Sequence, residues 1–207
     1  MIAIRTEFIE ALRANQEQFG IELNDAVVER LADFYEIVQE HNPILHLVGQ
    51  CSPAEFATRH VLESLTLLKH LPSGVRFADV GSGGGLPAIP CLLVRDDLKA
   101  VLIESKEKKT TFLQTAVERL GISSRADIVT RQYAEFTLPN VYAVTCRALD
   151  KFTTRLPRLL KWTGNRVLLF FGGPALRDEL EKLGCTTDSR LMPLSEQRYL
   201  FVTRRRD

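Results

Sequence analysis

An acidic residue and a glycine-rich loop at residues 79–85 constrain this 207-residue chain more than any other feature of its sequence. The loop follows an apolar run at residues 75–80, which predicts a buried strand. Glycine accepts positive φ and lets a ligand approach the main chain closely, because it has no Cβ. A helix predicted to begin next would direct its unpaired N–H groups toward the same point. The segment predicts a small-molecule site built around Asp79, Gly81, Gly83, Gly85 and Leu86.

The spacing of the loop glycines narrows the choice of ligand. Gly81, Gly83 and Gly85 form Gly-x-Gly-x-Gly, whereas the dinucleotide fingerprint Gly-x-Gly-x-x-Gly would need a glycine at Leu86. No Gly-Lys-Ser/Thr ending follows, so the loop is not a phosphate-binding P-loop. An acid before three alternating glycines, after a strand, is typical of Rossmann-like S-adenosylmethionine-dependent methyltransferases. A turn that binds no ligand is the alternative explanation.

A second acid lies about 20 residues beyond the loop, the separation expected of a ribose-binding carboxylate. Glu104 ends the apolar run at residues 99–104. A carboxylate there can accept hydrogen bonds from both ribose hydroxyls. The alternative is that Glu104 only caps the helix predicted to follow it. We predict that Glu104 binds the cofactor together with the glycine loop.

Residues 71–207 alternate between predicted strands and helices, and then end in two strands. The alternation predicts a mostly parallel sheet with right-handed crossovers. Residues 186–192 and 197–203 flank a short turn and predict an antiparallel hairpin. The fold class is therefore α/β, Rossmann-like. The predicted strands are 75–80, 99–104, 125–130, 141–146 and 165–171, and the predicted helices are 86–95, 107–120, 150–162 and 175–183.

Residues 1–70 predict a helical extension packed on the Rossmann-like core of residues 71–207. Three helices are expected from apolar residues at helical spacing and from capping residues between them. The first helix is expected to begin at Thr6 and to end at Gly20. The second is expected to be capped by Asn24 and to be kinked or ended by Pro43. The third is expected to follow Ser52.

Composition and charge indicate an ordinary globular protein, with 45% hydrophobic residues, 26% charged residues and a formal net charge of +1. No apolar run approaches the ~20 residues that cross a bilayer. Residues 1–13 show no signal-peptide core. Cys51, Cys91, Cys146 and Cys185 form no Cys-x-x-Cys pair or Cys/His cluster, so no zinc site is expected. We expect a cytoplasmic monomer that binds neither a metal nor a membrane.

Basic residues recur at helical spacing after the fourth predicted strand. One cationic helix face can follow RNA phosphates, whereas a solvated helix surface is the alternative. Arg147 lies at the carboxyl end of that strand, where ligands of a parallel sheet bind, or else it pairs with Asp79 or another acid. We predict Arg147 as the catalytic residue, contacting cofactor and substrate, and Lys151, Arg155 and Arg158 as substrate-binding residues.

Four segments resemble the RsmG/GidB methyltransferase family, in the same order along nearly the whole chain. The most specific is Gly-Leu-Pro-x-Ile-Pro at residues 85–90. Residues 59–64, Arg-His-Val-Leu-Glu-Ser, resemble the family's Arg-His-x-Leu-Asp-Ser. Residues 146–149, Cys-Arg-Ala-Leu, resemble its Ser-Arg-Ala-Phe. Residues 42–48 resemble an Asn-rich segment, with His46 where Asn is usual.

The resemblance implies a function and a set of site residues. The family uses S-adenosylmethionine to methylate N7 of a guanine in the decoding-region loop of 16S ribosomal RNA. The expected partner is that RNA, alone, in the 30S subunit or in an assembly intermediate. His60 is expected to be a core histidine near the site rather than a catalytic one. By position, Gly81 and Leu86 would line the methionine and ribose side, Glu104 would hold the ribose, Tyr133 and Ala134 would flank the adenine, and Arg147 would lie between cofactor and substrate.

One position departs from the family pattern. The family has a Lys-Gly pair at the end of its fifth strand, where this chain has Phe171 before Gly172. Three consequences are open. The loss of this cation weakens the contact with RNA, Lys151 or Arg155 supplies the charge instead, or the position varies in the family without an effect on activity. Two other functions stay open. They are a methyltransferase for a small molecule or protein, which would not need the basic row, and an RNA-binding module without catalysis.

Overall fold

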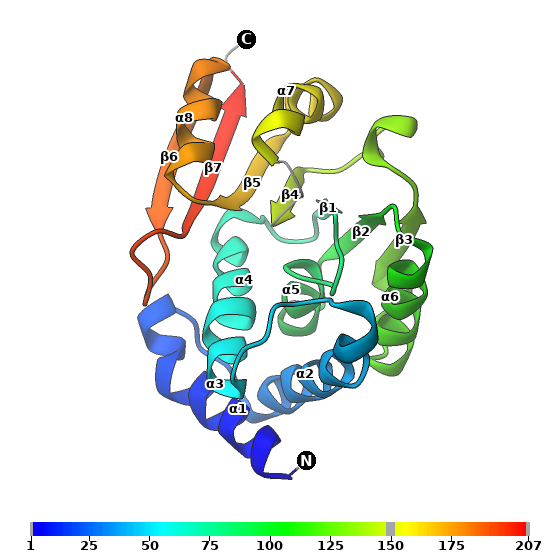
Figure 1. The fold of residues 1–207 in the computed structure, drawn as a ribbon, viewed down its shortest axis with the longest axis vertical. Helices are drawn as coiled ribbons and strands as arrows, with labels where there is room; N and C mark the ends of the chain where they lie inside the picture. The colour runs from blue at the N-terminus through cyan, green and yellow to red at the C-terminus, as the bar shows by residue number, and fades with distance from the viewer. Residues whose placement is uncertain (1, 148–151, 206–207) are drawn as a thin grey trace.

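The computed structural model describes residues 2–147 and 152–205, which build a seven-stranded sheet with helices on both faces (Figure 1). The strand order is β3-β2-β1-β4-β5-β7-β6, with β7 antiparallel to both of its neighbours and all other pairs parallel. The predicted Rossmann-like α/β fold with a C-terminal antiparallel hairpin is confirmed. The strands are β1 (Arg76–Val80), β2 (Lys99–Glu104), β3 (Ala126–Thr130), β4 (Ala143–Arg147), β5 (Val167–Gly172), β6 (Cys185–Leu191) and β7 (Tyr199–Arg205).

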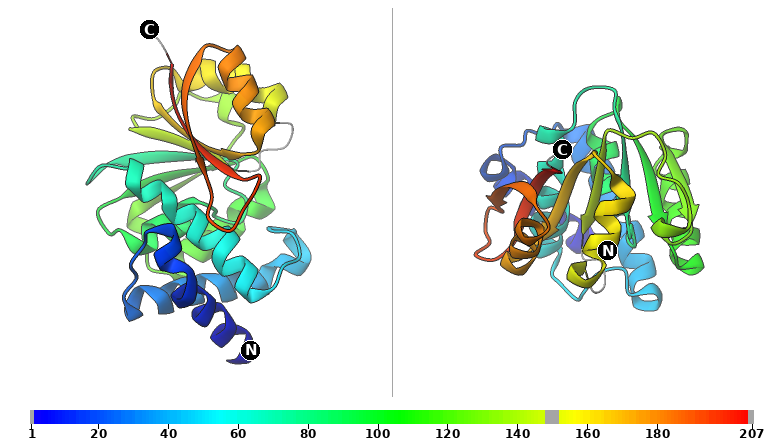
Figure 2. Two further views of the ribbon diagram at one scale, coloured as in Figure 1. Left: turned by 90° about the vertical axis from the view of Figure 1, so that its left-hand side faces the viewer. Right: turned by 90° about the horizontal axis from the view of Figure 1, so that it is seen from above.

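Alternate residues of the central strands pack against different helical layers, as the two-residue period of a strand requires. Phe77 of β1 joins a core with the N-terminal helices, α5 and α6, whereas Ala78 and Val80 face α7 and α8. The two termini lie at opposite ends of the molecule (Figures 1 and 2). The helices are α1 (Ile2–Asn15), α2 (Asp25–Leu45), α3 (Pro53–Glu55), α4 (Glu63–Leu65), α5 (Ala88–Val94), α6 (Glu107–Arg119), α7 (Phe152–Thr163) and α8 (Pro174–Lys182).

The N-terminal helices agree with the sequence prediction at two caps and differ at one start. Gly20 ends the first helical segment in the left-handed conformation, with φ 63°. Asn24 caps α2, because its side chain accepts a backbone N–H of the first turn. The first helix begins at Ile2 rather than at Thr6, since Arg5 in its first turn pairs with acidic side chains of α2.

Two further helix boundaries differ from the prediction. α2 continues through Pro43 to Leu45, because a proline in the last turn removes only one helical hydrogen bond. α5 begins at Ala88, two residues later than predicted. The reason is a turn closed by a 2.7 Å hydrogen bond from the N–H of Gly85 to the carbonyl of Ser82, which keeps the chain in the loop.

The helical segment after Ser52 is irregular near the end of the sheet. It contains a π-helical segment, η2 (Phe56–Leu62), between α3 and α4, and then a 3-10 segment, η3 (Thr66–His70). π-helical turns change which residues face a neighbouring element and are frequent at functional sites. No helix in the described part of the chain is long and apolar enough to cross a membrane.

An aromatic cluster joins the N-terminal helices. Phe8 of α1 stacks on Tyr35 of α2 with 4.6 Å between ring centroids and contacts Phe56 of η2 at 6.1 Å. We predict that Phe8→Ala lowers the free energy of unfolding by about 3–5 kcal/mol, because it leaves a cavity in the core. Ile4→Ala on the same helix is the control, since Ile4 is 48% exposed. Urea unfolding measures both variants, and equal losses would contradict this packing.

Candidate active site

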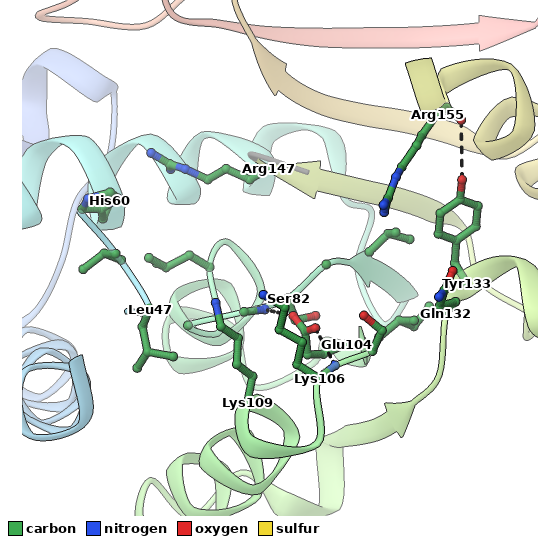
Figure 3. Close-up of a pocket in the computed structure, with 18 of the residues that line it drawn as sticks. Leu47, His60, Ser82, Glu104, Lys106, Lys109, Gln132, Tyr133, Arg147 and Arg155 are labelled. Atoms are coloured by element: carbon green, nitrogen blue, oxygen red, sulfur yellow. Dashed lines mark hydrogen bonds between the residues drawn. The ribbon is translucent and has the colours of Figure 1, made fainter. Parts of the chain in front are cut away.

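A pocket of about 560 Å³ lies at the carboxyl ends of the parallel strands. This volume is within the roughly 300–1,000 Å³ range of ligand sites, and this edge is where doubly wound sheets bind ligands. The loops after β1, β2 and β3 line it, together with the end of β4 and the start of α7. Figure 3 shows Tyr133 and Arg155 on one side, His60 and Arg147 on the other, and Glu104 between them.

The loop after β1 presents its main chain to this pocket. Gly81 and Gly83 line the pocket and both have positive φ, 76° and 49°. A Cβ on Gly83 would meet only the Gly81 carbonyl oxygen at 3.6 Å and the Lys109 Nζ at 4.0 Å, so its exposed side is open. A Cβ on Gly85 would instead lie 2.4 Å from Ile89 Cδ1. The missing side chain at Gly83 therefore leaves room for a ligand. The missing side chain at Gly85 leaves room for Ile89 of α5.

Glu104 fastens the loop to β2 and also lines the pocket. One carboxylate oxygen accepts the N–H of Gly83 at 3.1 Å, and the other accepts the N–H of Lys106 at 2.9 Å. The alternative, capping of the following helix, is not seen, because α6 begins at Glu107 and Glu104 binds the N–H of Lys106, the residue before it, rather than an N–H of the first helical turn. A carboxylate has about four acceptor positions, so capacity for two ribose hydroxyls remains. The loop and Glu104 together fit an adenosyl cofactor.

Asp79 lies beneath the loop rather than in the pocket. Its side chain is fully buried, and neither carboxylate oxygen has a hydrogen-bond partner among the described residues. Burial raises the pKa of Asp79 to about 8. The group is therefore mostly protonated at neutral pH, because the protein interior disfavours the charged form.

Arg147 at the end of β4 is held by protein groups at the pocket wall. Its guanidinium donates to the Arg59 carbonyl at 2.6 Å and pairs with Glu63 at 3.2 Å. The other oxygen of Glu63 accepts from Arg198 at 2.7 Å, and Glu63 is 1% exposed. Burial lowers the pKa of Arg147 to about 10, and the Glu63 carboxylate opposes that shift. The acid that pairs with Arg147 is Glu63, not Asp79.

Phe171 is the residue that, by the resemblance, is expected to replace a lysine. The Arg147 guanidinium carbon lies 5.3 Å from the centroid of the Phe171 ring, within the range of a cation–π contact. An aromatic ring thus supports Arg147 at this position.

The other side of the pocket is aromatic with a cationic edge. Tyr133 is 8% exposed and packs on Trp162 with 5.4 Å between ring centroids. Its hydroxyl donates to the Arg155 carbonyl at 3.5 Å (Figure 3). This side can stack on or enclose a planar base, which fits the adenine of the cofactor.

Unpaired cations surround the pocket opening. Lys106 and Arg131 are exposed, Lys109 is half-buried, and none of the three pairs with a carboxylate of the described residues. Arg155 adds a fourth such cation from the first turn of α7. Because buried Glu104 is the one acid lining this pocket among the described residues, the opening attracts polyanions.

The pocket brings most of the predicted site residues together. Asp79, Gly85, Ala134 and Arg158 do not line it, and Lys151 lies outside the described residues. Sequence reasoning gave no role to Lys106, Lys109 and Arg131 or to the segment after α2. The resemblance at residues 42–48 and 59–64 was the signal that could have found part of them. The predicted residues in the pocket are Gly81, Gly83, Leu86, Glu104, Tyr133, Arg147 and Arg155, and the additional ones include Leu47, Val48, Gly49, Arg59, Lys106, Lys109, Arg131 and Gln132.

No group of three or more His, Cys, Asp and Glu side chains that could hold a metal ion exists in residues 2–147 and 152–205.

Solved structures share the fold at low sequence identity. The pyocyanin biosynthetic protein PhzM aligns with a TM-score of 0.62 and 16% identity, over 83% of this chain and 61% of its own. The B. subtilis M1A22 tRNA methyltransferase TrmK aligns with a TM-score of 0.54 and 19% identity, over 70% of this chain and 65% of its own. These similarities concern the fold alone. The fold and the adenosyl-type pocket define a Rossmann-like S-adenosylmethionine-dependent methyltransferase.

Sequence comparison gives the family. A profile of the GidB family, described as rRNA small subunit methyltransferase G, matches residues 27–194. Ribosomal RNA small subunit methyltransferase G of Sorangium cellulosum is 36% identical over 203 residues, 94% of this chain and 80% of the relative. The Neisseria meningitidis serogroup C / serotype 2a protein of that name is 32% identical over 79% of this chain and 76% of the relative. The chain belongs to the GidB family, as its motifs predicted.

The buried Asp79 predicts a pH dependence of stability. Its pKa is about 8 in the folded chain and about 3.9 in an unfolded one. Between pH 4 and pH 8, Asp79 is deprotonated in the unfolded chain and still protonated in the folded one. The free energy of unfolding therefore falls as pH rises through this range. We expect the stability of Asp79→Asn relative to the wild type to increase from pH 5 to pH 8, by at most about 1.4 kcal/mol per pH unit.

Asp97→Asn is the matched control for this titration. The Arg95 side chain holds the pKa of the exposed Asp97 below its usual range, so Asp97 stays ionised in both states between pH 5 and 8. Urea unfolding at several pH values should give a constant difference for Asp97→Asn. A constant difference for Asp79→Asn as well would show that Asp79 is ionised in the folded protein.

Proposed function

We propose that the chain transfers the methyl group of S-adenosylmethionine to N7 of a guanine in the decoding-region loop of 16S ribosomal RNA. The observation that carries the proposal is one pocket with two different sides. The glycine loop, Glu104 and Tyr133 fit the adenosyl group on one side, and cations line the other side and the opening. Membership of the GidB family supports the same assignment.

The cofactor roles follow the order of the loops along the sheet edge. Gly81 and Leu86 would line the methionine and ribose side, and Glu104 would accept hydrogen bonds from the ribose hydroxyls. Tyr133 would flank the adenine, and Ala134, which follows it in the same turn, would do so through its backbone. Bound there, S-adenosylmethionine supplies an electrophilic methyl group on a sulfonium.

Guanine N7 carries a lone pair and no proton, so its methylation requires no general base. The protein's task is to align N7 with the methyl carbon and sulfur and to hold both reactants. This is consistent with the pocket, where His60 and Arg147 face the substrate side without an Asp/His proton relay. Catalysis would come from positioning and from charge.

Arg147 would act at the junction of cofactor and substrate. Its guanidinium is fixed by Glu63, the Arg59 carbonyl and the Phe171 ring. A fixed planar donor group can present one edge to a base or phosphate without losing side-chain entropy on binding. Glu63 balances part of its charge, which limits repulsion of the cationic product base.

We predict that Arg147→Ala reduces methyl transfer by a factor on the order of 100, a few kcal/mol of transition-state stabilisation. Arg147→Lys should restore only part of the activity, because a point charge cannot reproduce a planar, several-point contact. The assay is tritiated methyl transfer to 30S subunits from a strain that lacks the modification. Binding of S-adenosylhomocysteine and the melting temperature check the fold, and near-wild-type turnover of Arg147→Ala would remove this residue from the mechanism.

The cations at the opening would bind RNA phosphates. Lys109 and Arg155 face the pocket, and exposed Arg158 lies one turn further along α7. Lys151, which lies outside the described residues, stays a predicted substrate contact from its position in the sequence. Phosphate contacts release counterions, so affinity should fall steeply with salt.

We predict that the double variant Lys109→Glu/Arg155→Glu binds 16S ribosomal RNA at least about 10-fold more weakly and has a smaller salt dependence. Lys99→Glu is the control, because Lys99 is exposed at the opposite end of β2. Filter binding at several salt concentrations measures both, with S-adenosylhomocysteine affinity expected to stay unchanged. Equal effects of the double and control variants would mean that the row is only solvated surface.

The alternatives differ in these same measurements. A methyltransferase for a small molecule or protein would bind S-adenosylhomocysteine but would not need the cations at the opening. A noncatalytic RNA-binding module would bind RNA but not S-adenosylhomocysteine. We expect the protein to meet its ribosomal substrate in the cytoplasm, as a monomer.

A further inference from the structure

His60 lies on the substrate side of the pocket. It belongs to the π-helical segment η2, and it lines the pocket near Leu47 and Arg147, away from Tyr133 (Figure 3). A π-helical turn shifts the facing of side chains relative to a regular helix. The local backbone therefore presents this imidazole to the pocket rather than to the core alone.

The two ring nitrogens of His60 have different surroundings. The ring packs on buried Phe56 with 5.1 Å between centroids, and Nδ1 is buried with no hydrogen-bond partner among the described residues. The ring lines the pocket, and Nε2, unlike Nδ1, is not a buried atom without a hydrogen-bond partner. A buried N–H without an acceptor is rarer in proteins than a buried acceptor without a donor. The favoured neutral tautomer therefore carries its proton on Nε2, which can donate into the pocket.

The surroundings of His60 also fix its charge. Burial, followed by the cations of Arg147, Arg59 and Arg198, lowers the pKa of His60 to about 3. The acid Glu63 is occupied by two of these arginines. His60 is therefore neutral throughout the physiological pH range and has one N–H donor.

A neutral donor suits the edge of guanine that carries N7. Guanine presents two acceptors there, N7 and O6, whereas adenine presents the acceptor N7 beside the donor N6–H₂. The N7 lone pair must stay free to attack the methyl group, so recognition has to use O6. An N–H donor at this position forms a hydrogen bond with O6 of guanine, whereas it faces the amino group, another donor, in adenine. Being uncharged, it does not repel the positive charge that the base gains.

We propose that His60 donates a hydrogen bond from Nε2 to O6 of the target guanine and thereby determines that a guanine is methylated. This inference rests on the proposed function, since it concerns the acceptor base of that reaction. His60 is a specificity-determining residue here and takes no proton, because N7 methylation releases none from the base.

The test compares guanine with 2,6-diaminopurine at the target position of 16S ribosomal RNA reconstituted into 30S subunits. Diaminopurine keeps N7 but carries an amino group in place of O6. We expect the wild type to prefer guanine by at least about 100-fold in kcat/KM. In His60→Phe the value for guanine should fall by about 10- to 100-fold, while the value for diaminopurine changes less than about threefold.

Two more variants keep the result interpretable. His60→Gln has both an amide donor and an acceptor, so it should retain part of the guanine activity and raise the relative rate for diaminopurine. His70→Phe is the control, because His70 lies beside Tyr142 and Val167, near the other ends of the strands. Melting temperature and S-adenosylhomocysteine affinity report the fold of each variant.

The outcomes separate this inference from the proposed function. Equal losses for both bases in His60→Phe, with unchanged preference for guanine in His60→Gln, would overturn the role of His60 while leaving N7 methylation in place. A wild-type protein that methylates neither substrate would overturn the proposed function, and this inference with it.

Discussion

The arrangement of the substrate side depends on one buried carboxylate. Glu63 is 1% exposed and binds Arg147 at 3.2 Å and Arg198 at 2.7 Å. It thereby joins three parts of the chain, namely the N-terminal helical segment, the end of β4 and the loop before β7. Breaking such a pair leaves an unbalanced charge in a poorly solvated place, which costs about 3–5 kcal/mol. The position of Arg147, and with it the electrostatic field on His60, follows from this contact.

The cofactor side could be predicted from the sequence because its signals are local. A strand, a glycine loop and an acid one strand later follow one another closely in the sequence and lie on adjacent strands, and the Gly83 N–H donates to the Glu104 carboxylate at 3.1 Å. The start of α5 could not be predicted, since a turn at Gly85 competes with the helix. Leu47 and Lys109 were missed for a different reason. Tertiary packing brings the segment after α2 to the pocket, and Lys109 belongs to no row of basic residues at helical spacing such as the one that contains Arg155.

The sequence predicts the position of Arg147 in the sheet but does not identify the groups that surround its side chain. The chain places it at the carboxyl edge of the sheet, as a parallel strand must. Its donors nevertheless bond mostly to the protein, and Phe171 lies under its guanidinium at 5.3 Å. Lys109 and Arg155 also line the pocket and pair with no carboxylate of the described residues. Under the proposed function, the inner wall with Arg147 would orient the base, and the cations Lys109 and Arg155 would bind the phosphates.

The central claim is that this pocket methylates N7 of one guanine in 16S ribosomal RNA. Mass spectrometry of nuclease fragments of that RNA tests it most directly, with RNA from the native strain, a deletion strain and the complemented deletion strain. 7-Methylguanosine at one decoding-region position should disappear on deletion. It should return with the wild-type protein and not with Gly83→Val, whose side chain would fill the cofactor space. An unchanged level of 7-methylguanosine in the deletion strain would contradict the account.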